Sequence, residues 1–318
     1  MFDVTALGEL LIDFAPKSVN EAGYPTLSAN PGGAPGNFLA ALNRFGLKTA
    51  MIGKVGDDMF GRLLINTLND AGIETRGVVV DPRQFTTLAF VSLDESGNRD
   101  FSFARKPGAD TCLAPEEIDE ALITDSRVFH FGTLSLTDEP AAAATRRAIE
   151  LARVHGVTVS LDPNLRKPLW HSEDAAKQAI EWSLRQADIV KISDEEIAFL
   201  WGMTPEQGAQ RLLNEYGVSL VYATLGPKGC HVANKNGAAT VASPGGIHVV
   251  DTTGAGDIFG GSAMSRFLKL GKAPDALSVE EMTDITRFAC TAASLSTQKH
   301  GGISSVPTLE EVEAKLAE

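Results

Sequence analysis

The sequence predicts an α/β protein built on a doubly wound, mostly parallel sheet that is flanked by helices. Short runs rich in Val, Ile and Leu alternate along the chain with longer segments whose apolar residues recur every three or four positions. Clusters of Asp, Asn, Ser, Pro and Gly follow several of these runs, where the carboxyl ends of parallel strands would lie. No linker interrupts the alternation, so we expect one domain over residues 1–318.

The expected elements follow one another in strand and helix order, with right-handed crossovers between parallel strands. In the first part of the chain we expect strands at 3–8, 10–14, 49–54 and 78–80, a helix from about Gly36 and a helix at 58–71. In the remainder we expect strands at 128–132, 157–161, 189–192, 220–224, 230–233, 240–242 and 247–250. Helices are expected at 140–154 and 173–186, and further helices between the strand at 189–192 and Tyr216. The strand runs are short and apolar, and the helical segments are amphipathic.

Two alternating strands at 86–93 and 99–105 interrupt this rhythm. The segment between them, 94–98, has the composition of a hairpin turn. We expect this hairpin to leave the main sheet and to form a small β-sheet lid with the strand at 10–14 and its neighbours. The lid strands would then be inserted at about 10–30 and 86–106. An edge hairpin of the main sheet is the alternative, because such a hairpin needs no function.

Composition limits the class of partner. The formal net charge of −13 argues against nucleic acid and anionic membranes, which would repel the protein on average. Three scattered cysteines, Cys112, Cys230 and Cys290, suggest neither a disulfide framework nor a zinc site. The chain starts without a basic, apolar leader, and no run approaches the roughly 18 apolar residues of a membrane helix. We therefore expect a cytoplasmic protein that binds small molecules.

The segment 249–261, Val-Val-Asp-Thr-Thr-Gly-Ala-Gly-Asp-Ile-Phe-Gly-Gly, carries the clearest chemical signal. Gly254 and Gly256 allow backbone N–H groups at a helix start, with that of Ala255 between them, to converge on an anion. Asp257 would be repelled by a bound phosphate, and a useful role for it is to accept a proton from an attacking hydroxyl. The alternative is an acidic residue that only satisfies first-turn amides.

Two other glycine-loop sites are excluded by counting. The segment that starts at Gly254 has Phe259 where the dinucleotide-binding pattern requires its third glycine. No glycine stands at the required distance before Gly-Lys-Ser or Gly-Lys-Thr, so the chain has no Walker P-loop. A nicotinamide cofactor is not expected, and ATP would be bound in another way.

Two glycine-rich motifs carry a family resemblance. The loop at 30–37, Asn-Pro-Gly-Gly-Ala-Pro-Gly-Asn, leads to Ile-Gly-Lys-Val-Gly-Asp-Asp-Met-Phe-Gly at 52–61, and Asp-Thr-Thr-Gly-Ala-Gly-Asp follows at 251–257. Together they resemble the two signatures of the ribokinase-type (PfkB) sugar kinases. Gly-Glu-Leu-Leu-Ile-Asp-Phe at 8–14, with 87–91 and 101–105, makes the chain most similar to fructokinases. The resemblance implies a ribokinase-like fold with ATP and Mg²⁺ as cofactors, and it raises K⁺ and a homodimer through the lid as further features.

The resemblance assigns a nucleotide side. Asn164 and Arg166 match residues near the transferred phosphates, where a guanidinium can neutralise charge. Glu196 matches a carboxylate that organises Mg²⁺ through water, while Ser193 replaces the family's Asn and has helix capping as its alternative role. The residues expected to bind the nucleotide are Asn164, Arg166, Ser193, Glu196, Thr224, Gly226, Gly229, Gly254 and Gly256, with 289–293 against the adenine.

The resemblance also assigns a sugar side and a cation loop. The residues expected to bind sugar are Asp13, Gly32, Gly33, Asn37, Arg105 and Asp257. Arg105 would reach the substrate when the lid closes, and a solvated surface arginine is the alternative. The residues expected around a monovalent cation are Asp251, Thr253, Gly302 and Ser304, with a turn role as the alternative for Asp251.

The predicted reaction is ATP-dependent phosphorylation of a sugar primary hydroxyl, from D-fructose to fructose 6-phosphate. Asp257 is the general base, and the 254–257 backbone is the anion hole, assisted by Arg105. The first alternative is a 2-keto-3-deoxygluconate kinase, whose substrate carboxylate needs a further cation; Arg105 and Arg166 leave this open. The second is a catalytically silent sugar or nucleotide sensor, which would not need the base.

Overall fold

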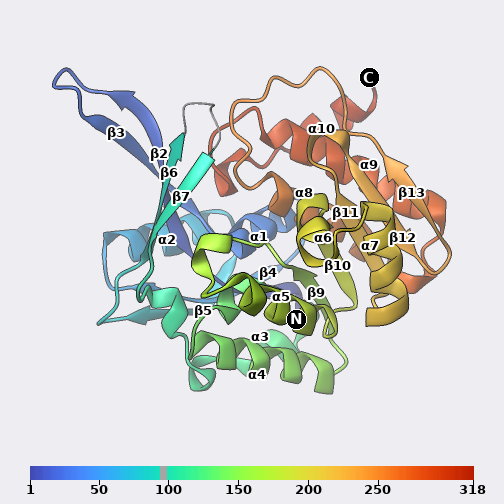
Figure 1. Cartoon of the computed structure of the whole chain (residues 1–318), viewed down its shortest axis with the longest axis horizontal. Coiled ribbons are helices and arrows are strands. Elements are labelled where there is room, and N and C mark those ends of the chain that lie inside the picture. The colour runs from blue at the N-terminus through green and yellow to red at the C-terminus, as the bar shows by residue number, and fades with distance from the viewer. Residues whose placement is uncertain (94–98) are drawn as a thin grey trace.

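A computed structural model, described over residues 1–93 and 99–318, contains a large and a small β-sheet (Figure 1). The large sheet has nine strands in the order β13-β12-β11-β10-β9-β8-β1-β4-β5. All neighbours are parallel except β12, which is antiparallel to both β11 and β13. The strands are β1 (Phe2–Leu7), β4 (Thr49–Gly56), β5 (Glu74–Asp81), β8 (Ser126–Gly132), β9 (Thr158–Asp162), β10 (Ile189–Ser193), β11 (Leu220–Thr224), β12 (Cys230–Asn234) and β13 (Gly237–Val241). The predicted doubly wound, mostly parallel sheet is confirmed.

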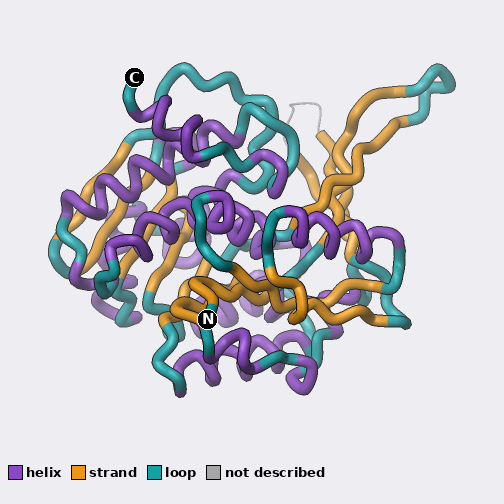
Figure 2. The backbone as a smooth tube through the Cα atoms, turned by 180° about the vertical axis from the view of Figure 1, so that it is seen from behind, coloured by secondary structure: helices purple, strands orange, loops and turns teal. Residues whose placement is uncertain are grey.

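Helices cover both faces of the large sheet (Figures 1 and 2). The helices that share one apolar core are α1 (Ala34–Arg44), α2 (Met59–Asp70), α8 (Ala255–Leu270), α9 (Val279–Ser296) and α10 (Leu309–Leu316). Those of the second core are α3 (Glu120–Thr124), α4 (Ala141–Val154), α5 (Glu173–Leu184), α6 (Asp194–Trp201) and α7 (Pro205–Arg211). Both faces of the central strands are therefore buried, which explains why these strands read as continuous apolar runs.

Short helices connect the main elements. The single-turn 3₁₀ segments are η1 (Ala109–Cys112), η2 (Pro115–Glu117), η3 (Thr133–Leu136), η4 (Lys167–Leu169), η6 (Gly226–Lys228), η7 (Pro274–Ala276) and η8 (Ile303–Ser305), and η5 (Leu212–Tyr216) is a π-helical turn. Several longer helices begin with a capping box, such as Ser278 with Glu281 at α9 and Thr308 with Glu311 at α10. Among the described residues, every helix is too short or too polar to cross a lipid bilayer.

The small sheet forms the predicted lid. Its strand order is β3-β2-β6-β7, with β2 (Leu11–Val19), β3 (Pro25–Gly32), β6 (Thr87–Leu93) and β7 (Arg99–Ala104). None of these strands pairs with the large sheet, so the alternative of an edge hairpin is wrong. The β2–β3 hairpin projects beyond the body of the molecule (Figure 1). The predicted turn at 94–98 lies outside the described residues.

The predicted strand at 247–250 is wrong. Residues 247–250 form no strand and pair with none of the described strands, so β13 is an edge of the large sheet. The amides of Val250 and Asp251 both donate to the Thr297 carbonyl at the end of α9, at 2.7 and 3.0 Å. Val249 and Val250 are exposed, so their β-branched side chains do not reflect burial in a sheet. The chain therefore enters α8 from a loop held by α9.

Candidate active site

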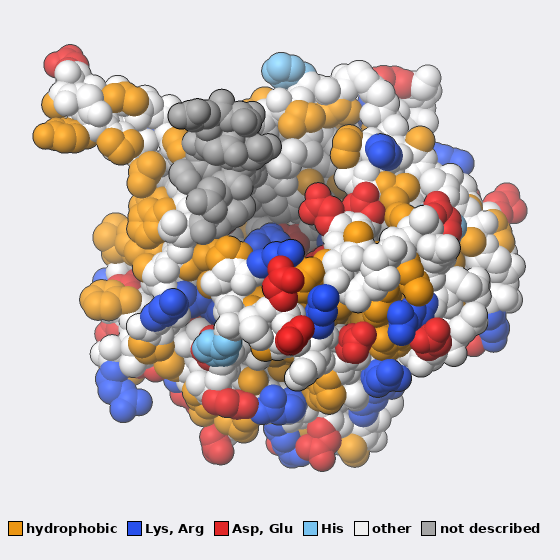
Figure 3. All heavy atoms as spheres, viewed as in Figure 1, with side chains coloured by type: hydrophobic (Ala, Val, Ile, Leu, Met, Phe, Trp, Pro, Cys, Tyr) orange, Lys and Arg blue, Asp and Glu red, His pale blue; other side chains and the backbone are white. Residues whose placement is uncertain are grey.

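Two cavities meet at the carboxyl edge of the large sheet, below the lid. The larger has a volume of about 760 Å³ and lies against β10, β11 and the start of α6. The smaller, of about 280 Å³, lies between the lid strands and α1. Five residues line both cavities: Asn164, Arg166, Thr252, Gly254 and Asp257. Acidic and basic side chains gather at the centre of the molecular face that Figure 3 shows. Ligands in the two cavities would meet at Asp257.

The start of α8 forms part of the wall between the cavities. Gly254 has a φ of 74°, which a glycine adopts without strain, and no side chain caps the helix there. The amide of Ala255 donates to the Thr252 carbonyl at 3.3 Å, whereas Gly254, Gly256 and Asp257 line the larger cavity. The uncapped first turn and the helix dipole suit an anion in that cavity.

Asp257 combines a base-like pKa with a fixed orientation. Asn37 Nδ2 donates to Asp257 Oδ2 at 2.9 Å. Burial raises the pKa of Asp257 to about 6, and the Asp162 carboxylate adds to this rise. The hydrogen bond from Asn37 and the charges of Lys191 and Arg166 oppose it. The carboxylate is therefore ionised at neutral pH and still basic enough to accept a proton.

The predicted sugar-binding residues gather around the smaller cavity. Asp13, Gly33 and Asn37 line it, and Gly32 lies behind Asp13, where a Cβ would come within 2.7 Å of Asp13 Oδ2. Gly33 has a φ of 115°, and its Cβ would lie 2.3 Å from the Glu9 carbonyl oxygen. Asn37 Oδ1 is a buried acceptor with no hydrogen-bond partner among the described residues. A ligand hydroxyl could satisfy it.

Glu9 is a further residue of the smaller cavity, and sequence reasoning assigned it no role. It lies two residues after the buried end of β1, lines this cavity and is only 4 % exposed. Its Oε1 accepts the Ala34 amide at 3.0 Å, at the start of α1. Burial raises the pKa of Glu9 to about 7. An acidic residue just beyond the carboxyl end of a strand, after Gly8, was the available signal.

Arg105 is not brought into either cavity. Its side chain is 3 % exposed, so the alternative of a solvated surface arginine is wrong. The guanidinium donates to Asp110 Oδ2, to Thr137 Oγ1 and to the Leu134 carbonyl, each at 2.8 Å. Leu134 lines the smaller cavity, so Arg105 contacts the wall of that cavity from behind.

Besides Asn164, Arg166, Gly254 and Gly256, four more of the predicted nucleotide-binding residues line the larger cavity: Ser193, Glu196, Thr224 and Gly226. Ser193 lies beside Thr224 in the β10–β11 register. Ser193 Oγ accepts the Glu196 amide at 3.1 Å and Glu196 Oε2 accepts the Ser193 amide at 2.9 Å, so the pair is a capping box at the start of α6. The alternative capping role of Ser193 is therefore confirmed. Glu196 Oε1 also accepts the Leu165 amide at 2.7 Å.

Two other predicted nucleotide contacts lie elsewhere in the fold. Gly229 has a φ of 113°, and a Cβ there would lie 1.9 Å from the Val241 carbonyl oxygen, so close backbone packing explains this glycine. Residues 289–293 belong to α9, and Ala289 and Ala292 are buried in its core. Neither segment is among the described residues that line the larger cavity.

Asn164 has an unusual backbone conformation in the wall between the cavities. Its φ is 48°, and it is the one non-glycine residue with a positive φ in the described part of the chain. Its amide donates to Asp162 Oδ1 at 3.2 Å. Asparagine tolerates this region better than most residues, and such conformations cluster at functional sites.

The two segments of the predicted cation loop are adjacent. Asp251 accepts the Thr253 amide at 2.8 Å and the Gly301 amide at 3.1 Å. A Cβ on Gly254 would lie 2.9 Å from the Cα of Gly302. Ser304 Oγ donates to the His300 carbonyl at 3.1 Å. Asp251 therefore has the alternative turn role in this structure, and it also ties the 251–254 turn to the 300–304 loop.

The described side chains do not by themselves form a metal-binding site. Within residues 1–93 and 99–318, no set of three or more His, Cys, Asp and Glu side chains is arranged to hold a metal ion. Asp194, Glu195 and Glu196 nevertheless line the larger cavity. This donor set fits Mg²⁺ that is held mainly by phosphate oxygens and water.

Comparisons with known proteins agree with this geometry. The model of the pfkB family carbohydrate kinases matches residues 1–309. Fructokinase-2 of Solanum lycopersicum is 40 % identical over 317 residues, which cover 97 % of this chain and 94 % of the relative. Fructokinase-1 of Zea mays is 41 % identical over 313 residues, covering 97 % and 96 % of the two chains.

Solved structures extend the similarity to the fold. The fructokinase of Xylella fastidiosa with bound ATP has a TM-score of 0.90 at 29 % identity, covering 99 % of this chain and 98 % of that one. The fructokinase of Vibrio cholerae O395 in its fructose, ADP and calcium ion bound form has a TM-score of 0.87 at 30 % identity, covering 99 % of each chain. The ribokinase-like fold and the family resemblance are confirmed. The chain belongs to the pfkB family of carbohydrate kinases.

Proposed function

We propose that the protein transfers the γ-phosphoryl group of ATP to the primary hydroxyl of D-fructose and forms fructose 6-phosphate. One observation carries the proposal: a nucleotide-sized and a sugar-sized cavity share a wall that holds Asp257 and the start of α8. Asp257 takes the hydroxyl proton, the sugar oxygen bonds to the γ-phosphorus, and the electron pair of the broken bond leaves with ADP. Positioning and electrostatics supply most of the rate in such a transfer.

The charge of the smaller cavity supports a neutral sugar. Three carboxyl groups line it, those of Glu9, Asp13 and Asp257, and Arg166 is the one Lys or Arg among its described lining residues. Arg105 already pairs with Asp110. The carboxylate of 2-keto-3-deoxygluconate would meet an excess of negative charge, so this alternative is not favoured. The fructokinase names of the relatives point the same way.

The catalytic groups also argue against a silent sensor. Asp257 and the uncapped turn at Gly254 are both intact, and Asn37 fixes the carboxylate.

When bound, Mg²⁺ would neutralise phosphate charge, and we propose that Glu196 orients one of its water ligands. We propose that Asp251, Thr253, Gly302 and Ser304 surround a monovalent cation, for which K⁺ is the expected ion. All three cysteines are free thiols, which fits a reducing cytoplasm.

We further propose that the lid mediates a homodimer. The projecting hairpin exposes the apolar side chains of Val19, Tyr24 and Leu27, and β6 exposes Phe90. Exposed apolar surfaces such as this one on the lid are sites of protein association in many proteins. A second copy of the lid would cover it.

An ADP-release assay over a panel of sugars tests the function. The panel contains fructose, glucose, ribose and 2-keto-3-deoxygluconate, and Asp257→Asn enzyme purified in parallel controls for contaminating kinases. We expect the highest kcat/KM with fructose. A higher value for 2-keto-3-deoxygluconate would overturn the fructose assignment while leaving the kinase assignment intact.

A further inference from the structure

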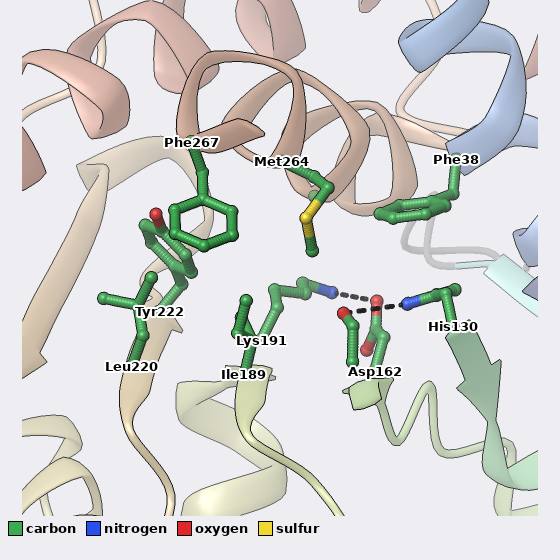
Figure 4. A pocket seen from close by; sticks show the side chains of 11 residues that line it. Phe38, His130, Asp162, Ile189, Lys191, Leu220, Tyr222, Met264 and Phe267 are labelled. Carbon is green, nitrogen blue, oxygen red and sulfur yellow. Dashed lines mark hydrogen bonds and ion pairs between the residues drawn. The ribbon is translucent and has the colours of Figure 1, made fainter. Parts of the chain in front are cut away.

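A largely buried lysine lies directly beneath the start of α8, and the mechanism above leaves it without a role. Lys191 is in the middle of β10, and its side chain is 14 % exposed. Its Nζ donates to Asp162 Oδ2 at 2.8 Å (Figure 4). On the other side, a Cβ built on Gly256 would lie 3.0 Å from Nζ. The ammonium group is therefore located between the end of β9 and the first turn of α8.

Lys191 borders two cavities. Below α8 the side chain borders an internal cavity of about 20 Å³, together with Phe38, His130 and Met264 (Figure 4). Lys191 also lines the larger, nucleotide-sized cavity, as does Gly256. Nζ is the atom of Lys191 nearest to Gly256, which lines the larger cavity, so the ammonium lies against the first turn of α8.

The ammonium is charged and has unused donors. Burial would lower the pKa of Lys191, but the carboxylates of Asp162, Glu196 and Asp257 outweigh burial and raise it. An ammonium group has three N–H donors, and Asp162 accepts one of them. The second oxygen of Asp162 accepts the Asn164 amide, so Asp162 is held in place from two sides. A cation kept at a helix start in this way is suited to an anion in the cavity.

We propose that Lys191 is a catalytic residue that donates a hydrogen bond to the phosphoryl group during its transfer, and that it completes the anion hole at the start of α8. This inference rests on the proposed phosphoryl transfer. Lys191 keeps its proton throughout: the hydroxyl proton goes to Asp257, the new bond joins the sugar oxygen to the γ-phosphorus, and the electron pair of the old bond leaves with ADP. The lysine stabilises the negative charge on the phosphoryl oxygens.

The proposal also explains why residue 256 is a glycine. Gly256 is not among the glycines with a positive φ, so its backbone does not require glycine. A Cβ at this position would lie 3.0 Å from Lys191 Nζ, so the ammonium would have to shift by a few tenths of an ångström. Gly254, by contrast, is required for its left-handed conformation.

The test separates a phosphate contact from a purely structural role. Lys191→Met removes the ammonium but leaves Asp162 buried without its partner, which by itself can destabilise the fold. Lys191→Met combined with Asp162→Asn removes both charges, and the Asn side-chain oxygen can still accept the Asn164 amide. Lys54→Met is the matched control, because Lys54 is another buried strand lysine, paired with Asp81 and Glu117 away from the cavities.

Steady-state kinetics and thermal unfolding are measured for all three variants. We expect Lys191→Met to lower kcat by about 100-fold, with the KM for fructose within about threefold of wild type. The double variant should regain most of the lost Tm and none of the lost kcat. Lys54→Met should lower Tm and leave kcat within about twofold of wild type.

Two results would overturn the inference: a Lys191→Met enzyme that keeps more than about a third of wild-type kcat, or a double variant in which kcat recovers together with Tm. If Lys191→Met does not fold, the double variant decides alone, since it carries no unpaired buried charge. The proposed function fails separately, in wild-type enzyme that releases no ADP with any sugar.

Discussion

Asp257 is the residue on which the chemistry depends most directly. Asp257→Asn should lower kcat by two to four powers of ten, about 3–5 kcal/mol of barrier, and change the KM for ATP and fructose only a few-fold. The amide has nearly the same shape and cannot accept a proton. Because the pKa of Asp257 is raised to about 6, wild-type kcat/KM should fall as pH drops through 6 and the carboxylate becomes protonated. Steady-state kinetics from pH 5 to 8 measure both effects, and more than a tenth of kcat in the variant would remove Asp257 from the mechanism.

Glu9 is expected to make the stability of the protein depend on pH. Its pKa is raised from 4.5 to about 7 by burial, so the folded protein binds this proton more tightly than the unfolded chain does. Glu9 should therefore make the protein less stable as pH rises from 4.5 through 7, by up to about 3 kcal/mol. Glu9→Gln stays neutral and keeps an oxygen that can accept the Ala34 amide, so its stability relative to wild type should be greater at pH 8 than at pH 5.

Urea unfolding at the two pH values measures this difference. Glu21→Gln, in the exposed turn of the lid hairpin, is the control and should follow wild type at both. An equal offset of Glu9→Gln at pH 5 and pH 8 would show that burial of Glu9 does not shift its protonation.

At the scale of elements, Arg105 connects the end of the lid to the body of the molecule. It follows β7, pairs with Asp110 in η1 and donates to the Leu134 carbonyl in η3. Arg105→Ala would leave Asp110 buried and unpaired, so the free energy of unfolding should fall by about 3–5 kcal/mol. Urea unfolding of the variant measures the change.

The sequence-based expectation for Arg105 is a kinetic one, and the same variant tests it. An arginine that acts on lid closure would show a lower kcat and faster ATP hydrolysis without sugar, at unchanged stability. Comparing ADP release with and without fructose separates this outcome from the structural one. A variant as stable as wild type would contradict the role inferred from the buried ion pair.

At the scale of the whole molecule, the projecting hairpin should determine the oligomeric state. Val19 and Tyr24 are each 68 % exposed and Leu27 is 41 % exposed. A charge in this surface would be buried without a partner in a dimer, so Tyr24→Glu should convert a dimer into a monomer in light scattering after gel filtration. Val154→Glu, an equally exposed apolar position on the body at the end of α4, is the control and should leave the mass unchanged. A wild-type protein that elutes as a monomer would contradict the proposal.

The sequence by itself determined the alternation of elements and the motif at 251–257, because strand and helix periodicity and glycine content are local properties. It failed at 247–250, where β-branched residues resemble a strand but the hydrogen-bond partner is the Thr297 carbonyl, 47 residues away from Val250. Local pattern does not reveal such a partner. Ser193 shows the opposite case, because its capping partner Glu196 is only three residues away and the sequence anticipated the role.

The tertiary structure alone decided which residues share a cavity and which charges neutralise one another. Lys191 lies in an apolar run that looks like an ordinary strand, and Glu9 lies in the short loop after β1. Their importance depends on Asp162, Gly256 and Ala34, which are distant in sequence. Arg105 is a second example, because the sequence match predicts contact with the substrate on lid closure but does not reveal the buried ion pair with Asp110. Coulomb energy and desolvation depend on distance and burial in space, and a linear pattern contains neither quantity.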